Sequence, residues 1–80
     1  MYEFFYTDEF KRDAKRLGRP MRKRLKKVIA RILENPERFK HLREGVPKFS
    51  VRFELYRVLY KVSGNRVELI RVGKRDAVYD

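Results

Sequence analysis

The sequence predicts an α+β fold in which a helical hairpin packs on one face of a mostly antiparallel sheet. Residues 8–34 repeat apolar side chains at spacings of three and four, the period of an amphipathic helix. Residues 48–72 alternate apolar and polar side chains in runs separated by turn signals, the period of a strand. The expected element order is β-α-α-β-β-β, and 80 residues suit a single domain over residues 1–80.

The N-terminal half is expected to hold one strand and two helices. Residues 2–6 are rich in aromatic side chains and favour a strand. Thr7, followed by two acidic residues, is typical of a helix start, because its hydroxyl accepts a free backbone N–H and the carboxylates suit the helix dipole. This helix is expected to end at Gly18, and Pro20 suits the first turn of the next one. The second helix should bury one apolar stripe: Met21, Leu25, Val28, Ile29, Ile32 and Leu33.

The C-terminal half is expected to form three strands, at residues 48–54, 55–62 and 66–72. Ser63-Gly64-Asn65 separates the last two and signals a tight hairpin, because Gly and Asn accept positive φ at low cost. The two-residue period then divides each strand between a core face and an opposite face. The opposite face should carry Ser50, Arg52, Arg57, Leu59 and Lys61.

The composition limits the kinds of site that the chain can hold. One histidine, His41, and no cysteine make a metal site or a disulfide framework unexpected, and the lack of cysteine fits a reducing compartment. No apolar run approaches about 20 residues, and no signal-peptide pattern opens the chain. We therefore expect a cytoplasmic protein with neither cofactor nor membrane contact.

The charge is strongly and unevenly positive. There are 22 Lys and Arg against 11 Asp and Glu, a formal net charge of +11, which suggests a polyanionic partner, with RNA or DNA ahead of an anionic membrane. Residues 11–31 contain eleven basic residues and one acidic residue, Asp13. A solvated helix face would explain any one of these cations, but it explains the unbalanced group less well. Arg22, Lys23 and Lys26 are the helix residues expected to contact RNA.

Cations are also expected on the sheet. Arg52 and Arg57 lie on neighbouring predicted strands, and Lys74 and Arg75 follow the last one. An electropositive sheet face suits an extended single strand, whose phosphates bind arginine side chains and whose bases stack on tyrosine.

The chain resembles the RelE/ParE superfamily of toxins from bacterial and archaeal toxin–antitoxin pairs, and among them most closely the RelE-like mRNA interferases. The resemblance covers nearly the whole chain in element order. Its most specific parts are Tyr56–Tyr60 and Val72–Arg75, followed by Val78-Tyr79, with weaker support from Leu42–Gly45 and Phe49–Arg52. Each motif is weak alone, but together, in this order and spacing, they are specific.

The resemblance implies a microbial RNase-type fold, metal-free cleavage of mRNA on the ribosome, and silencing by a cognate RelB-like antitoxin. It implies that Arg57 stabilises the scissile phosphate, that Arg75 serves the leaving 5′-oxygen or the transition-state charge, and that Tyr79 stacks on or orients the substrate. The family often has two basic residues on the preceding strand. Here these positions are Ser50 and Arg52, so one basic residue is kept and Lys48 is a possible substitute. The expected RNA-binding residues of the sheet are Lys48, Lys61 and Lys74.

Two other functions stay open at this point. One is a ParE-like gyrase inhibitor, a binding module of the same fold whose members generally lack the terminal basic-tyrosine set that this sequence retains. The other is a non-catalytic RNA-binding member of the fold, which the loss of a basic residue at Ser50 keeps open. No residue clearly takes the place of a general base, and the nuclease hypothesis requires Arg57 and Arg75 to lie on one side of the molecule.

Overall fold

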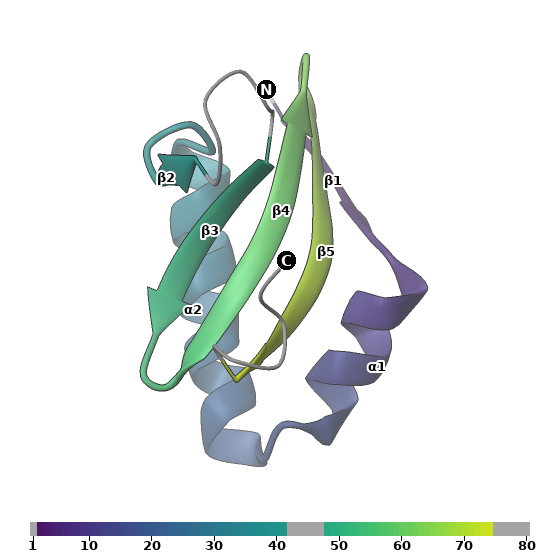
Figure 1. Cartoon of the computed structure of the whole chain (residues 1–80), viewed down its shortest axis with the longest axis vertical. Coiled ribbons are helices and arrows are strands. Elements are labelled where there is room, and N and C mark those ends of the chain that lie inside the picture. The colour runs from purple at the N-terminus through teal and green to yellow at the C-terminus, as the bar shows by residue number, and fades with distance from the viewer. Residues whose placement is uncertain (1, 42–47, 75–80) are drawn as a thin grey trace.

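The computed structural model describes residues 2–41 and 48–74 and shows two helices on one side of a five-stranded sheet (Figure 1). The strand order is β1-β5-β4-β3-β2, and only β1 pairs in parallel, with β5. The α+β prediction is confirmed, with one short strand added before the predicted C-terminal three. The elements are β1 (Glu3–Tyr6), α1 (Asp8–Arg16), α2 (Arg19–Glu34), β2 (Lys40–His41), β3 (Lys48–Phe53), β4 (Tyr56–Ser63) and β5 (Arg66–Lys74).

The start of α1 is fixed by Thr7, as predicted. Its Oγ1 accepts a hydrogen bond from the Phe10 N–H at 3.0 Å and donates one to the Ile70 carbonyl at 2.7 Å. The same hydroxyl therefore caps the helix and attaches it to β5. The second helix follows almost at once and carries Pro20 in its first turn, where a missing N–H is tolerated.

Two-residue turns join β3 to β4 and β4 to β5. Gly64 has a φ of 61° between β4 and β5, as its place in the predicted hairpin requires. Between β3 and β4 the turn residues are Glu54, with a φ of 55°, and Leu55, which is 71% exposed. Both residues were expected inside strands. They form the turn instead, because the sheet register pairs Phe53 directly with Tyr56.

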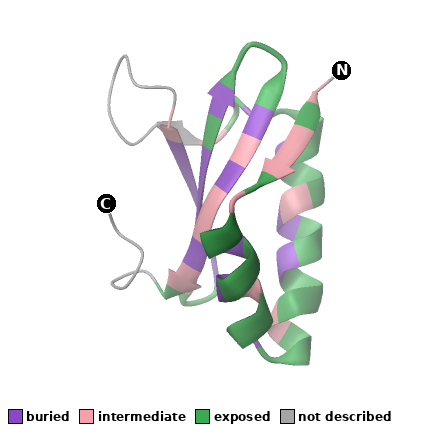
Figure 2. Cartoon of the chain, turned by 90° about the vertical axis from the view of Figure 1, so that its right-hand side faces the viewer, coloured by how far each residue is buried: buried purple, intermediate pink, exposed green. Residues whose placement is uncertain are grey.

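The core lies between the helices and the sheet (Figure 2). At its centre the Tyr60 ring stacks on Phe49 with 5.2 Å between centroids, and the Tyr60 hydroxyl donates to the Pro36 carbonyl at 2.6 Å. Leu33 was expected in the buried stripe of α2 but is 47% exposed. The buried cluster is Phe10, Leu17, Leu25, Val28, Ile32, Phe49, Val51, Phe53, Val58, Tyr60, Val62, Val67, Leu69 and Val72. Neither described helix is long and apolar enough to cross a bilayer.

Candidate nucleic-acid interface

The sheet face that lies away from the helices, here called the open face, presents two arginines side by side. Arg52 on β3 and Arg57 on β4 are direct partners in the strand register. The next pair, Phe53 and Tyr56, stacks at 5.7 Å and packs on the core side, so the arginines belong to the open face. Side chains opposite each other in this way start about 5 Å apart, and like charges there repel. An anion between them would be attracted by both guanidiniums.

On the third strand, β5, the residue next to the arginine pair is a glycine. Gly73 on β5 is the register partner of Arg57. Arg52, Arg57 and Gly73, here called the arginine row, therefore cross three strands near one end of the sheet, and no β5 side chain flanks Arg57 at this position. Arg75 and Tyr79, which the resemblance places at the same site, lie outside the described residues, so their meeting with Arg57 stays a prediction.

A second pair of cations lies farther along the open face. Lys48 and Lys61 are partners in the β3–β4 register and are each four residues from the nearer arginine, about 13 Å at roughly 3.3 Å per residue. Lys61 also faces Glu68 on β5, which balances part of its charge. This end of the face is therefore less positive than the arginine row.

Two uncharged side chains between these pairs are buried on the open face. Ser50 and Leu59 are register partners and are 7% and 6% exposed. Ser50 occupies the position where relatives often carry a basic residue. Its burial means that the described surface offers neither a charge nor an exposed hydroxyl there.

Lys74 lies on the other face from Arg57, which differs from the expectation that both join one concavity. The register shifts between Leu59 and Tyr60, so that Ile70 is an extra residue on β5. Val67 and Leu69 point to the core before this bulge, and Val72 does so after it. The bulge thus reverses the alternation and turns Lys74, the partner of Tyr56, toward the helix side.

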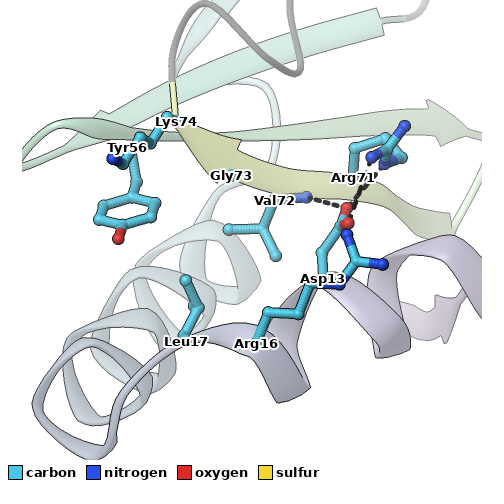
Figure 3. Close-up of a pocket in the computed structure, with 8 residues that line it drawn as sticks. All are labelled: Asp13, Arg16, Leu17, Tyr56, Arg71, Val72, Gly73 and Lys74. Atoms are coloured by element: carbon cyan, nitrogen blue, oxygen red, sulfur yellow. Dashed lines mark hydrogen bonds and ion pairs between the residues drawn. The ribbon is translucent and has the colours of Figure 1, made fainter.

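There Lys74 lines a hollow of about 210 Å³ between the end of α1 and the end of β5, here called the edge groove (Figure 3). The groove lies where β5 extends beyond β1, whose pairing ends at Leu69. Arg16, Arg71 and Lys74 contribute the positive charges of its lining, and Asp13 contributes the negative one.

Asp13 is a buried carboxylate that was not identified from the sequence. It is 7% exposed and accepts hydrogen bonds from Arg71 Nε at 2.7 Å, Arg71 Nη2 at 3.2 Å and the Val72 N–H at 3.1 Å. Burial raises the pKa of Asp13, but the bonds from Arg71 and Val72 and the charges of Arg71 and Arg16 outweigh it and hold the pKa below its ordinary value. The sequence did contain a signal for this burial. Asp13 is the only acidic residue of residues 11–31, and its spacing from Phe10 and Leu17 places it on the same apolar face of the predicted helix.

The helix cations belong to α2, which lies on the other side of the sheet from the open face. Arg22, Lys23 and Lys26 are exposed on α2, which lies behind the sheet when the open face is turned to the viewer (Figure 1). Their neighbour Arg24 pairs with Glu54 at 3.3 Å. A nucleic acid that lies only on the open face would not reach α2, so we expect the two sets of cations to meet different segments.

The described residues hold no cluster of three or more His, Cys, Asp or Glu side chains suited to a metal ion. What the arrangement offers instead is fixed positive charge: two guanidiniums on the open face, with a cationic groove at the adjacent sheet edge. Such groups bind phosphate and stabilise negative charge that develops during a reaction.

Comparisons with known proteins agree with this architecture. The family model described as "ParE toxin of type II toxin-antitoxin system, parDE" matches residues 4–79. A chain of the intact Escherichia coli RelBE toxin–antitoxin complex is 28% identical, with a TM-score of 0.82 over 92% of this chain and 96% of that chain. The isolated E. coli RelE toxin is 26% identical, with a TM-score of 0.80 over 92% and 84%. A chain of the RelBE2 complex from Mycobacterium tuberculosis is 26% identical, with a TM-score of 0.80 over 92% and 98%.

A search of curated proteins found no match. The family match nevertheless spans nearly the whole chain, and the three RelE-type structures named above share its fold at TM-scores of 0.80 to 0.82. The chain therefore belongs to the RelE/ParE superfamily of toxins from type II toxin–antitoxin systems.

Proposed function

We propose that this protein is an mRNA endoribonuclease toxin, a single domain over residues 1–80 that acts on the ribosome in the cytoplasm and is silenced by a cognate RelB-like antitoxin. The observation that carries the proposal is the cross-strand pair of Arg52 and Arg57 on the open face. The antitoxin is supported by relatives that were crystallised as toxin–antitoxin complexes.

The proposed reaction uses the 2′-hydroxyl of the RNA itself. The 2′-oxygen attacks phosphorus, the bond from phosphorus to the 5′-oxygen breaks, and the products are a 2′,3′-cyclic phosphate and a 5′-hydroxyl. Negative charge grows on the non-bridging oxygens, and the guanidiniums of Arg52 and Arg57 stabilise it, each contributing on the order of 10²–10³ in rate. Arginine stays protonated in proteins, so these residues hold charge while the proton passes from the 2′-oxygen to a base and an acid supplies the 5′-oxygen.

The remaining candidate residues have supporting roles in this proposal. Arg75 would stabilise the leaving 5′-oxygen, and Tyr79 would stack on the substrate. Lys48 and Lys61 would bind phosphates on one side of the cut, since they lie on the same face about 13 Å from the arginines. The ribosome would align the 2′-oxygen with phosphorus, which explains why we expect little or no cleavage of free RNA.

Primer extension on mRNA from translating ribosomes tests the proposal. The purified protein should produce discrete new 5′ ends, and Arg57→Ala and Arg52→Ala should each cut about 10²–10³-fold more slowly. Arg38→Ala is the matched control, because Arg38 is an exposed arginine paired with Glu34 at 3.7 Å, outside the arginine row. Intact mRNA with the wild-type protein, or equal cutting by wild type and Arg57→Ala, would overturn the proposal.

A ParE-like inhibitor of DNA gyrase is the second candidate, because the matching family model is that of ParE toxins. This activity needs binding to a protein and no RNA chemistry, so the arginine row would have no catalytic role. A supercoiling assay distinguishes the two. Cleaved DNA complexes in the presence of gyrase, together with uncut mRNA on ribosomes, would establish the second function in place of the first.

The burial of Ser50 favours a third candidate, an RNA-binding member of the fold that does not cut. Such a protein would bind RNA with an affinity that falls steeply with salt and would leave ribosomal mRNA intact. The primer-extension assay and a salt titration of RNA binding, made on the same preparation, separate this candidate from the nuclease.

A further inference from the structure

We propose that the edge groove is a second nucleotide-binding subsite, which takes the phosphate and base of a nucleotide adjacent to the one at the arginine row. The inference rests on the proposed RNA substrate and assigns a role to residues that the proposed reaction does not use. Three features carry it: the charge of the rim, the apolar floor and the position beside Gly73.

The rim of the groove has an excess of positive charge. Arg16 comes from α1, and Arg71 and Lys74 come from β5, while Asp13 is the acidic residue of the lining. Arg16 and Arg71 lie on either side of the Asp13 carboxylate (Figure 3). Among the residues that the structure describes, Arg16 and Lys74 form no ion pair. Asp13 balances only part of the charge of Arg16 and Arg71, so an added phosphate would meet a net positive rim.

Arg71 is held in place for such a contact. Asp13 binds its Nε and Nη2 groups, which use two of the five N–H donors of a guanidinium. The other three donors are not used by Asp13, and Arg71 is 40% exposed. A guanidinium that is already ordered loses little conformational freedom when it binds a phosphate through its remaining donors.

The floor of the groove is apolar. Leu17 is 6% exposed and Val72 1%, and the ring of Tyr56 closes one end. Nucleobases stack on aromatic side chains with little regard to sequence, and Tyr56 supplies such a ring beside Leu17 and Val72. An apolar floor inside a cationic rim thus matches the two halves of a nucleotide.

The position of the groove favours RNA over an acidic protein segment. Gly73 lines the groove and is also the register partner of Arg57, so the groove begins where the arginine row ends. Neighbouring strands lie about 4.8 Å apart, which makes the row from Arg52 to Gly73 roughly 10 Å long. A strand of RNA that crosses this row would pass over the free edge of β5 directly into the groove.

The test measures binding of a 2′-O-methyl RNA hexamer, which its own 2′-oxygen cannot cleave, by NMR titration of the ¹⁵N-labelled protein. We expect amide shifts at Leu17, Val72 and Gly73 in addition to shifts on β3 and β4. The Arg16→Gln/Lys74→Gln double variant should bind about tenfold more weakly, and its salt slope should fall by about 0.7 for the lost phosphate contact. Arg71 is kept, because its loss would unpair the buried Asp13.

Lys11→Gln/Lys15→Gln is the matched control, since it also removes two charges, both exposed on α1, the helix of Arg16, and outside the groove. Equal weakening by the two double variants, in spectra that show both proteins folded, would overturn the inference. Unchanged hexamer binding with lost binding of a polyglutamate peptide would also overturn it and would assign the groove to a protein partner. Intact mRNA on ribosomes, with hexamer shifts in the groove, would refute the proposed nuclease while the groove stands as an RNA-binding site.

Discussion

The Asp13 carboxylate accepts a hydrogen bond from Arg71 Nε at 2.7 Å and so attaches α1 to the part of β5 that extends beyond β1. The same carboxylate accepts the Val72 N–H at 3.1 Å. An unpaired strand edge with a free N–H is a template for unwanted strand pairing. Asp13 accepts the Val72 N–H at this edge, so that this group is not left free for another strand. It also positions the Arg71 guanidinium, which lines the edge groove.

Replacement of Asp13 should destabilise the fold. Asp13→Asn keeps an oxygen for the Val72 N–H but loses the ionic bond to Arg71, and we expect a loss of about 1–3 kcal/mol in the free energy of unfolding. Urea denaturation measures it. Glu37→Gln, at an exposed acid outside the helices, serves as the control and should change stability by less than about 0.5 kcal/mol. An Asp13→Asn protein as stable as this control would contradict the role assigned to the pair.

The same pair predicts a pH dependence. Interaction with Arg71 and Val72 holds the folded-state pKa of Asp13 below its ordinary 3.8, despite the opposing effect of burial. The stabilisation is therefore fully present above about pH 5 and is lost as the pH falls below 3.8 through the folded-state pKa. The stability difference between wild type and Asp13→Asn should be constant from pH 5 to 7 and narrow toward pH 2. A difference that grows on acidification would show that Asp13 is not held as the carboxylate.

Much of this fold was predictable because its signals are local. Thr7 caps α1, Gly64 turns the last hairpin, and the two-residue period places Val58 and Tyr60 in the core with Arg57 on the opposite face. The arginine pair of the open face followed from that same period. Local patterns identify strands, but they do not say which strands pair, so the parallel contact of β1 with β5 was not foreseen.

The features that were not predicted depend on contacts between distant segments. Asp13 and Arg71 are 58 residues apart, and no spacing rule links them. The bulge at Ile70 reverses the alternation of β5, which is why Lys74 lies with Tyr56 and not with Arg57. The two-residue strand β2 is too short to show any period, since an alternation needs several residues to be recognised.

The backbone of Glu54 in the β3–β4 turn should be strained, and a glycine at this position should relieve the strain. A φ of 55° crowds any side chain with a Cβ, whereas glycine adopts it freely. Glu54→Gly and Glu54→Ala both lose the exposed ion pair with Arg24 at 3.3 Å, so their comparison isolates the backbone effect. We expect the glycine variant to be more stable than the alanine variant by about 1 kcal/mol in urea denaturation. Equal stabilities would show that the turn is relaxed with a side chain present.

The hydrogen bond of the Tyr60 hydroxyl should stabilise the fold at neutral pH, and this stabilisation should be lost at alkaline pH. Tyr60→Phe loses the 2.6 Å bond to the Pro36 carbonyl, and we expect a loss of about 1–2 kcal/mol at pH 7. Burial raises the pKa of Tyr60 above its usual 10.0, so its contribution is complete below pH 10 and declines as the pH rises further. The gap between wild type and Tyr60→Phe should thus shrink above pH 10. Tyr6→Phe, at a 44% exposed ring, is the control, and an equal loss there would contradict the argument.

The cations of α2 should affect ribosome binding without affecting the cut. Arg22, Lys23 and Lys26 are exposed on α2, which lies behind the sheet that carries the arginine row, so we expect them to contact ribosomal RNA and not the scissile nucleotide. Reversing all three to Glu should weaken ribosome binding at least tenfold in sedimentation assays and reduce its salt dependence, because phosphate contacts release counterions.

The cleavage positions in primer extension should stay where they are, since phosphate contacts carry affinity without sequence preference. The matched triple Lys11→Glu, Arg12→Glu and Lys15→Glu on α1 controls for net charge. If this triple weakens binding as much as the α2 triple, the effect is one of overall charge, and α2 is not a specific contact. If the α2 triple moves the cleavage positions, its cations lie nearer the substrate than the structure places them.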